Sequence, residues 1–347
     1  MLNKKIRTLV VDDSAIFRNV ISTALNQASD IEVIGTAIDP MDAKDKILQL
    51  KPDVITLDVE MPKMNGIEFL KKMLPIQKVA AIVVTSSAVE AFEAISAGAV
   101  DYIKKPSARE MDAFAHELRK AVRVASTARV GAGRAVVTPS SSAASAPQQV
   151  MSILNPGKNT NKVIAIGAST GGTEAIQVVV QNLPANTPGT VIVQHMPAGF
   201  TKMYADRLNK ICKMEVREAQ DGDRLTQGLI LLGAGEFHLR LRKDTRGYYV
   251  SSQRGEKVTG HCPSVDVLFD SVADVAKSNA LGVILTGMGG DGAKGMLNMK
   301  NSGAFTIGQD KETCVVYGMP EVAFRLGGVV KQAPLQNIAG VLMEKLR

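Results

Sequence analysis

The chain has 347 residues and a mass of 36.9 kDa, about twice the size of a typical single domain, so we expect two domains. Its content of 45% apolar and 22% charged residues excludes global disorder. The net charge of +7 disfavours nucleic-acid binding because it is spread thinly: residues 1–125 carry 17 basic and 17 acidic side chains, and residues 162–347 carry 21 and 17.

The N-terminal segment from Met1 to Val11 has basic residues, but Asp12 and Asp13 end its apolar stretch. A signal peptide needs a longer apolar core, so we expect none here. Because no later apolar run is long enough to span a bilayer, we expect a cytoplasmic protein without direct membrane insertion.

Short apolar runs alternate with stretches of helical periodicity in the first 125 residues. The predicted strands are 8–11, 33–35, 54–57, 81–84 and 101–103. Asp39 followed by Pro40 predicts one helix start, and Ser107 with Glu110 predicts a capping box for a last helix that ends near Val124. Strands separated by helices predict an α/β domain with a doubly wound parallel sheet.

Charged residues follow three of these strands. Asp12 and Asp13 end the first, Asp58 ends the third, and Lys105 follows the fifth. In a parallel sheet, ligands collect at the carboxyl ends of the strands. Crowded carboxylates repel unless a hard cation neutralises them, so the combination predicts a Mg²⁺ pocket in which Asp58 could attack a phosphoryl group. Taken alone, each carboxylate would more simply be a solvated loop charge.

The motifs Val10–Asp13, Leu57–Pro62 and Tyr102–Pro106, together with Thr85, resemble the receiver domains of two-component response regulators over residues 5–124. The resemblance implies a flavodoxin-like domain that a histidine kinase phosphorylates on Asp58, with Lys105 on the phosphoryl oxygens. It implies Thr85 and Tyr102 as the switch pair, although the segment after Thr85 is about two residues short and Ser86 could compete for that role. The implied magnesium ligands are Asp12, Asp13, Asp58 and the backbone carbonyl of Glu60.

Residues 126–161 consist mainly of Ala, Ser, Thr, Pro, Gly and Gln, with no acidic and no aromatic residue. Such a segment buries too little apolar surface to offset the entropy of ordering. We therefore expect a flexible linker between a first domain over residues 1–125 and a second over residues 162–347.

The second domain repeats the alternation of strands and helices. The predicted parallel strands are 163–166, 191–193, 230–232, 282–285 and 304–307. A hairpin is expected from 238–242 and 247–251, which alternate apolar and polar residues around Lys243–Arg246. The basic residues of this hairpin are interpreted as a solvated face rather than as a site for an acidic partner.

A candidate nucleophile lies in the run Gly167–Gly171, which matches G-x-S-x-G between a predicted strand and a helix that starts near Thr173. Ser169 would be exposed in a sharp turn, where backbone N–H groups could face a developing oxyanion. Taken alone, a Gly-Ser turn is more simply a turn.

Ser169 needs a base, and the chain has four histidines. His195 is preferred because it directly follows a strand at the same sheet edge, whereas His116 lies in the other domain and His238 and His261 are interpreted as structural or surface residues. Asp291, in the glycine-rich loop after the strand 282–285, could orient the imidazole. Helix capping or a plain loop charge are the alternatives for Asp291.

A dinucleotide site is a rival interpretation of the same loop. Gly287, Gly289 and Gly292 satisfy G-x-G-x-x-G, and Asp310 follows 18 residues later. Asp291 would place a negative charge where the pyrophosphate should bind, and Ser169 and His195 would have no role, so this interpretation is disfavoured.

The motifs Gly167–Gly172, Gln194–Pro197, Pro263–Asp266, Thr286–Gly289 and Gly318–Pro320 resemble the CheB family of chemotaxis protein-glutamate methylesterases over nearly the whole chain. The resemblance implies Ser169 as nucleophile, His195 as general base, Asp291 as its orienting partner, and Thr170 and Met288 in the oxyanion region. The chain departs from the family pattern at Cys262, at Gly233-Ala234-Gly235 and at Glu321.

The resemblance implies hydrolysis of glutamate γ-methyl esters on the cytoplasmic helices of methyl-accepting chemotaxis receptors, without a cofactor for the esterase step. The same site could deamidate receptor glutamines. A chemotaxis histidine kinase is the implied phosphodonor, and the unphosphorylated receiver is expected to cover the Ser169 cleft. A catalytically silent receptor-docking adaptor stays open as an alternative, because the sequence does not show that the triad residues meet. A transcription factor is disfavoured by the strand-rich, mildly basic second half.

Overall fold

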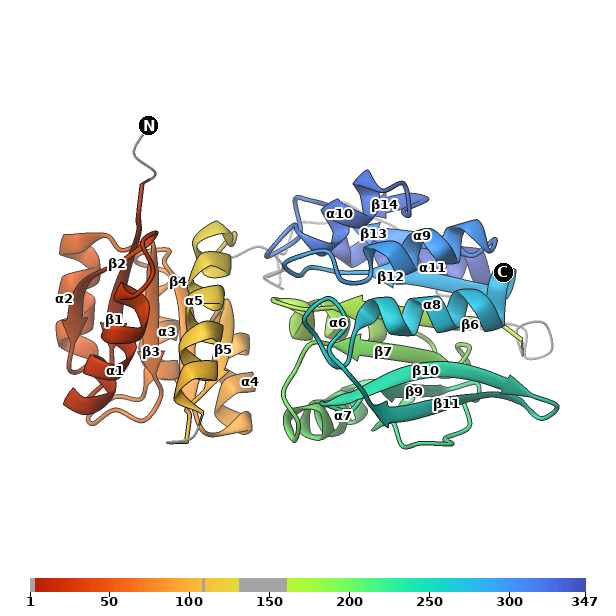
Figure 1. Ribbon diagram of the computed structural model, residues 1–347, viewed down its shortest axis with the longest axis horizontal. Coiled ribbons are helices and arrows are strands. Elements are labelled where there is room, and N and C mark those ends of the chain that lie inside the picture. The colour runs from red at the N-terminus through yellow and green to blue at the C-terminus, as the bar shows by residue number, and fades with distance from the viewer. Residues whose placement is uncertain (1–3, 108–109, 131–160) are drawn as a thin grey trace, which may run out of the picture. The chain divides into compact units, whose positions relative to one another are not determined.

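The computed structural model describes residues 4–107, 110–130 and 161–347, and the chain divides into two compact units, Met1–Gly131 and Ala132–Arg347 (Figure 1). The predicted linker falls mainly on residues 131–160, which lie outside the described residues. No helix among the described residues combines the length and the apolar character that a membrane span requires.

The first unit is a parallel five-stranded sheet in the order β2-β1-β3-β4-β5. Helices α1 and α5 pack together on one face, and α2, α3 and α4 cover the other (Figure 1). The predicted doubly wound sheet is confirmed, and each predicted strand lies within an observed one. The strands are β1 (Ile6–Val11), β2 (Ile31–Ala37), β3 (Val54–Asp58), β4 (Ala80–Thr85) and β5 (Asp101–Lys104), and the helices are α1 (Ala15–Asn26), α2 (Pro40–Leu50), α3 (Gly66–Met73), α4 (Ala88–Ala97) and α5 (Met111–Thr127).

Two helix ends of this unit were predicted from caps, with different outcomes. Asp39 caps α2, since its Oδ1 accepts hydrogen bonds of 2.9 Å from the N–H groups of Met41 and Asp42. The predicted capping box of Ser107 and Glu110 is only half formed, because the Glu110 carboxylate does accept from the Ser107 N–H but Glu110, not Ser107, is the N-cap residue of α5. The Glu110 carboxylate accepts bonds from the Ser107 N–H and hydroxyl, at 2.9 and 2.6 Å, so that hydroxyl is engaged outside the helix, which begins only at Met111 and runs to Thr127.

The second unit has a parallel seven-stranded sheet in the order β14-β13-β12-β6-β7-β9-β8. The outer strands β8 and β14 were not predicted. Helices α8 and α9 pack together on one face, and α6 and α11 contact each other on the opposite face (Figure 1). The strands are β6 (Val163–Ala168), β7 (Thr190–Gln194), β8 (Glu215–Glu218), β9 (Leu229–Leu232), β12 (Ala280–Ile284), β13 (Phe305–Gln309) and β14 (Lys331–Ala333), and the helices are α6 (Gly172–Val180), α7 (Phe200–Ile211), α8 (Val265–Ala276), α9 (Ala293–Asn301), α10 (Met319–Arg325) and α11 (Ile338–Leu346).

The predicted hairpin is present as β10 (Phe237–Asp244) and β11 (Gly247–Arg254). Asp244 pairs with Gly247, so the connecting loop has only the two residues Thr245 and Arg246 rather than the predicted four. Alternate residues of both strands, Leu239, Leu241, Tyr248 and Val250, are buried in the core that includes α8. The hairpin therefore closes one side of the second unit by burying its apolar face.

The central strands of this sheet bring distant residues to one edge. Strands β6 and β7 are buried throughout and pair in register, with Ala168 opposite Gln194. The next residues, Ser169 and His195, therefore leave the sheet side by side. Strand β12 flanks β6 on its other side, and its following loop carries Asp291 to the same edge.

Candidate functional sites

The turn between β6 and α6 is made possible by glycines. A Cβ on Gly167 would lie 2.2 Å from a methyl group of Val265, and a Cβ on Gly172 would lie 2.1 Å from Gln194 Oε1. Gly171 has φ of +75°, which glycine adopts without strain. These residues let the helix begin shortly after the strand and place Ser169 in the turn, as the nucleophile-elbow motif predicts, although Ser169 is half-buried rather than exposed.

Hydrogen bonds hold the Ser169 backbone in place. Its N–H donates to the Thr286 carbonyl at 3.0 Å, and its carbonyl accepts from the Gly172 N–H at 2.7 Å. The Gln194 side-chain amide donates both to this carbonyl, at 2.9 Å, and to the His195 carbonyl, at 3.1 Å. Gln194 therefore ties the Ser169 turn to the start of the His195 loop, a role that the sequence did not reveal.

His195 and Asp291 form a buried pair. His195 Nε2 lies 2.8 Å from Asp291 Oδ2, and the two side chains are 7% and 2% exposed. The other ring nitrogen, Nδ1, is buried and has no hydrogen-bond partner among the described residues. The carboxylate accepts the Nε2 proton, so Nδ1 carries the free lone pair and can accept a proton from a hydroxyl.

Asp291 is surrounded by donors. Its Oδ1 accepts from the hydroxyls of Thr259 and Ser264, at 2.6 and 2.7 Å, and its Oδ2 accepts from the Val265 N–H at 2.7 Å. Burial raises the pKa of Asp291, but the hydrogen bonds from His195, Thr259 and Ser264 outweigh it and hold the pKa below its usual value. Asp291 is therefore a buried anion rather than a solvated loop charge. The N-cap of the helix that follows it, α9, is Gly292, but the Asp291 carboxylate does accept hydrogen bonds from the N–H groups of Val265 and Asp266 in the first turn of α8.

The loop that carries Asp291 packs closely on the Ser169 turn. A Cβ on Gly287 would lie 2.4 Å from Met319 Sδ and 2.7 Å from Ser169 Cβ. Met288, the next residue, is 38% exposed. The close packing of Gly287 leaves no room for a pyrophosphate against this glycine, which argues against the dinucleotide interpretation. The Asp310 carboxylate instead accepts hydrogen bonds from the Thr313 N–H and hydroxyl.

The two remaining histidines of the second unit differ. His238 is 1% exposed, with Nδ1 accepting from the Ser264 N–H at 3.3 Å and Nε2 donating to the Glu256 carbonyl at 2.8 Å, so it is structural as predicted. The His261 ring stacks on that of His195, with centroids 3.7 Å apart and planes 5° from parallel. The sequence did not predict this neighbour of His195, because nothing in the spacing of a loop residue reveals where its ring lies.

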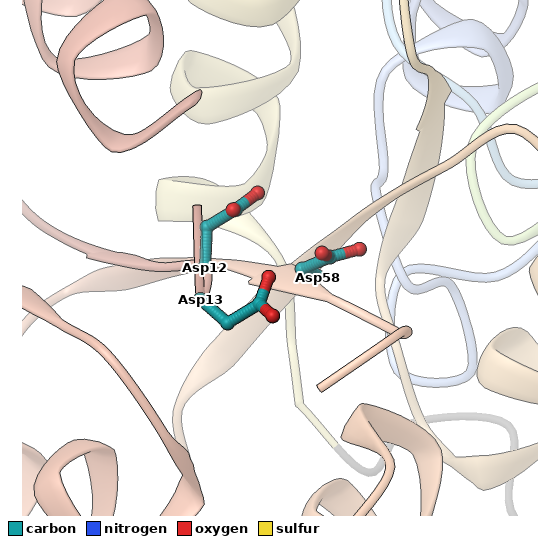
Figure 2. Close-up of side chains that lie close together, drawn as sticks. All are labelled: Asp12, Asp13 and Asp58. Atoms are coloured by element: carbon teal, nitrogen blue, oxygen red, sulfur yellow. The ribbon is translucent and has the colours of Figure 1, made fainter. Parts of the chain in front are cut away.

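In the first unit, Asp12, Asp13 and Asp58 come together at the carboxyl ends of β1 and β3 (Figure 2). One oxygen from each carboxylate lies within 4.8 Å of the others, and Lys105 Nζ lies 2.8 Å from Asp58 Oδ1. Burial and the charge of Asp58 raise the pKa of Asp12 to about 6. Oδ2 of Asp12 is buried and has no hydrogen-bond donor among the described residues. An unpartnered carboxylate oxygen in an acidic cluster fits a hard divalent cation.

The candidate switch residues occupy the neighbouring strands. Thr85 is 2% exposed and follows Val84, the residue that pairs with Asp58. Its hydroxyl donates to Glu90 Oε2 at 2.6 Å and accepts from the Ser87 N–H at 3.1 Å. Ser86 is exposed. Its neighbour Thr85 is thus the buried hydroxyl beside the acidic cluster, which favours Thr85 over Ser86 for the switch role.

Tyr102, the other candidate switch residue, lies on β5 and packs against the apolar core of the first unit. Burial raises its pKa well above the usual value for tyrosine. Glu60 has an exposed side chain, and its N–H donates to Asp58 Oδ1 at 3.4 Å. Its backbone is therefore next to Asp58, where the resemblance places a carbonyl ligand.

Comparison with known proteins gives matches over both units. The family model described as CheB methylesterase matches residues 164–342, and the model described as response regulator receiver domain matches residues 8–115. Protein-glutamate methylesterase/protein-glutamine glutaminase 2 of Syntrophomonas wolfei is 49% identical over 345 residues, covering 98% of this chain and 97% of that protein. The corresponding protein of Salmonella typhimurium is 43% identical over 349 residues, covering 99% and 97%. The crystal structure of the Thermotoga maritima CheB methylesterase catalytic domain aligns with a TM-score of 0.52 at 39% identity, covering 53% of this chain and 98% of that one.

Proposed function

Since this chain belongs to the CheB methylesterase family and carries a response regulator receiver domain, we propose that Ser169, His195 and Asp291 form its catalytic triad. The chain is a receiver-regulated protein-glutamate methylesterase of the chemotaxis system, and the resemblance found in its sequence is confirmed. The observation that carries the proposed triad is the buried His195–Asp291 hydrogen bond, with the free Nδ1 of His195 beside the strand end that bears Ser169.

The substrate is a glutamate γ-methyl ester on a chemotaxis receptor. Ser169 Oγ attacks the ester carbonyl carbon while His195 Nδ1 takes the hydroxyl proton, and Asp291 stabilises the imidazolium. The N–H groups of Thr170 and Met288 donate to the tetrahedral oxyanion. His195 then returns the proton to the leaving methoxide, which departs as methanol. Water, deprotonated by the same nitrogen, releases the acyl group from Ser169 as glutamate.

Glutamine deamidation follows the same path, with ammonia as the leaving group. The names of the Syntrophomonas wolfei and Salmonella typhimurium relatives include protein-glutamine glutaminase. Ammonia is a poorer leaving group than methanol, so this reaction depends more strongly on proton donation by His195. Both reactions use the same three side chains and need no cofactor.

The receiver domain implies phosphorylation, and Asp58 is the proposed phosphoacceptor with a chemotaxis histidine kinase as donor. Asp12, Asp13, Asp58 and the Glu60 carbonyl would hold Mg²⁺, which supplies positive charge against the phosphoryl oxygens when bound. Lys105, already 2.8 Å from Asp58, adds a second positive charge at the same oxygens. The Thr85 hydroxyl and Tyr102 would respond to the phosphorylated state.

Labelling with a serine-directed phosphonate tests the proposed nucleophile and separates the esterase from the silent adaptor. We expect one label per chain, located on Ser169 and absent from Ser169→Ala. Ser278→Ala, which changes an exposed serine of the same unit, is the matched control and should label fully. An unlabelled wild-type chain would favour the silent adaptor. A label that persists in Ser169→Ala would show that another residue is the reactive nucleophile and would contradict the proposed triad.

A further inference from the structure

A tight turn formed by residues 258–261 lies next to the His195–Asp291 pair, and we call it the 258–261 turn. The N–H of Val258 donates to the His261 carbonyl, and the His261 N–H donates to the Val258 carbonyl, both at 3.0 Å. The central residues both have positive φ, +50° at Thr259 and +85° at Gly260. This combination is typical of type I′ turns, which hold their two ends in a fixed register.

Thr259 adopts a backbone conformation that is unfavourable for its residue type. A β-branched residue at positive φ is strained, and such strain persists where surrounding contacts enforce it. Its Oγ1 lies 2.6 Å from Asp291 Oδ1 and 2.7 Å from the Val258 carbonyl. The hydroxyl has one proton, and the ionised carboxylate is the stronger of the two acceptors. The strained residue therefore donates a charge-assisted hydrogen bond to the buried anion.

At the other end of the turn, His261 covers one face of the His195 ring. The hydrogen bond to Asp291 fixes the position of His195 Nε2, but it allows the ring to tilt about the line from Nε2 to the carboxylate. A parallel ring with its centroid 3.7 Å away blocks that tilt on one side. The stack thus restricts the direction in which Nδ1 points.

We propose that the 258–261 turn is a positioning element for the esterase triad, in which Thr259 fixes the Asp291 carboxylate and His261 fixes the plane of the His195 ring. This inference rests on the proposed function of Ser169, His195 and Asp291. Neither Thr259 nor His261 exchanges a proton with the substrate. They act through the base and its partner, so that Nδ1 is aligned with the nucleophile before the ester arrives.

Substitutions at Thr259 distinguish the effect of its hydroxyl on kcat from the effect of the side chain's shape. Thr259→Val keeps the β-branch and the volume but removes the donor, and we expect kcat for methanol release to fall by roughly 10-fold to 100-fold, with KM changed by less than about twofold. Thr259→Ser keeps the hydroxyl and should retain kcat within about threefold. Both are measured in the full chain, with methylated receptor membranes and a small-molecule phosphodonor.

Substitutions at His261 separate a flat ring from simple filling of space. His261→Leu removes the ring face, and the stacking contribution corresponds to a decrease in kcat of about 3-fold to 10-fold. His261→Phe restores a flat ring that cannot titrate, and it should recover kcat to within about twofold of the wild type. This pair tests the proposal independently if a Thr259 variant fails to fold.

A purely structural turn would give a different pattern. The positioning role would be overturned if kcat fell equally in Thr259→Val and Thr259→Ser, or equally in His261→Leu and His261→Phe. A change confined to KM would also overturn it. Ser169→Ala is measured beside these variants. If Ser169→Ala is inactive while Thr259→Val and His261→Leu keep the wild-type kcat, the positioning role fails and the triad stands. If Ser169→Ala is active, the proposed function itself fails.

Discussion

Thr85 donates a 2.6 Å hydrogen bond from its hydroxyl to Glu90 Oε2, which ties the end of β4 to the first turn of α4. Glu90 is therefore a competitor for the hydroxyl that would contact a phosphoryl group on Asp58. Any movement of Thr85 toward that group must break this bond. A hydrogen bond to a charged acceptor contributes about 1.5–3 kcal/mol, enough to shift a two-state equilibrium roughly 10-fold or more.

Removing the competing acceptor should make activation easier. We expect Glu90→Ala to raise methanol release without phosphodonor by several-fold, whereas Glu90→Gln, which retains a carbonyl acceptor, should stay close to the wild type. Activity is measured on methylated receptor membranes with and without a small-molecule phosphodonor. An unchanged basal rate in Glu90→Ala would show that the Thr85–Glu90 bond does not restrain the switch.

A second buried carboxylate, beside the proposed triad, should make the stability of the second unit depend on pH. Asp266 is 5% exposed, and burial, followed by the charge of Asp291, raises its pKa to about 6 despite the 2.8 Å hydrogen bond from the Gly295 N–H. A raised pKa means that the folded state binds the proton more tightly than the unfolded state. Asp266 therefore reduces stability as the pH rises from about 4 to about 6, and the full penalty is present above that range.

Asp266→Asn removes this charge and keeps an oxygen that can accept from Gly295. We expect the variant to be more stable than the wild type at pH 7.5 by about 1–3 kcal/mol, with the difference shrinking toward zero near pH 4. Urea denaturation followed across this pH range measures the difference. A gap that stays constant with pH would mean that Asp266 does not titrate as its surroundings indicate.

The acidic cluster of the first unit should bind Mg²⁺ and be stabilised by it. At 100 times its dissociation constant, a bound ion adds about 2.7 kcal/mol to the stability of the folded state. We expect Mg²⁺ to raise the temperature at which the receiver domain unfolds in the wild type. In Asp13→Asn, most of this rise should be lost. Asp45→Asn, an exposed position on α2, is the control and should respond like the wild type. Equal stabilisation of both variants would place the ion elsewhere.

The strands that position both sites could be predicted because they are buried on both faces and read as continuous apolar runs. The missed strands β8 and β14 lie at the edges of their sheet, where charged residues such as Glu215 and Lys331 hide the pattern. Ser169 and His195 could be predicted because strand ends converge at one edge. Thr259 and His261 could not, since the path of their loop depends on tertiary packing.

The proposed catalytic triad is tested most directly by methanol release from methylated receptor membranes. The release is compared between the wild type and Ser169→Ala, each with and without phosphodonor. We expect the wild type to release methanol faster with phosphodonor, and Ser169→Ala to release it at no more than the background rate under both conditions. Release by Ser169→Ala at the wild-type rate would contradict the assignment of Ser169 as the nucleophile.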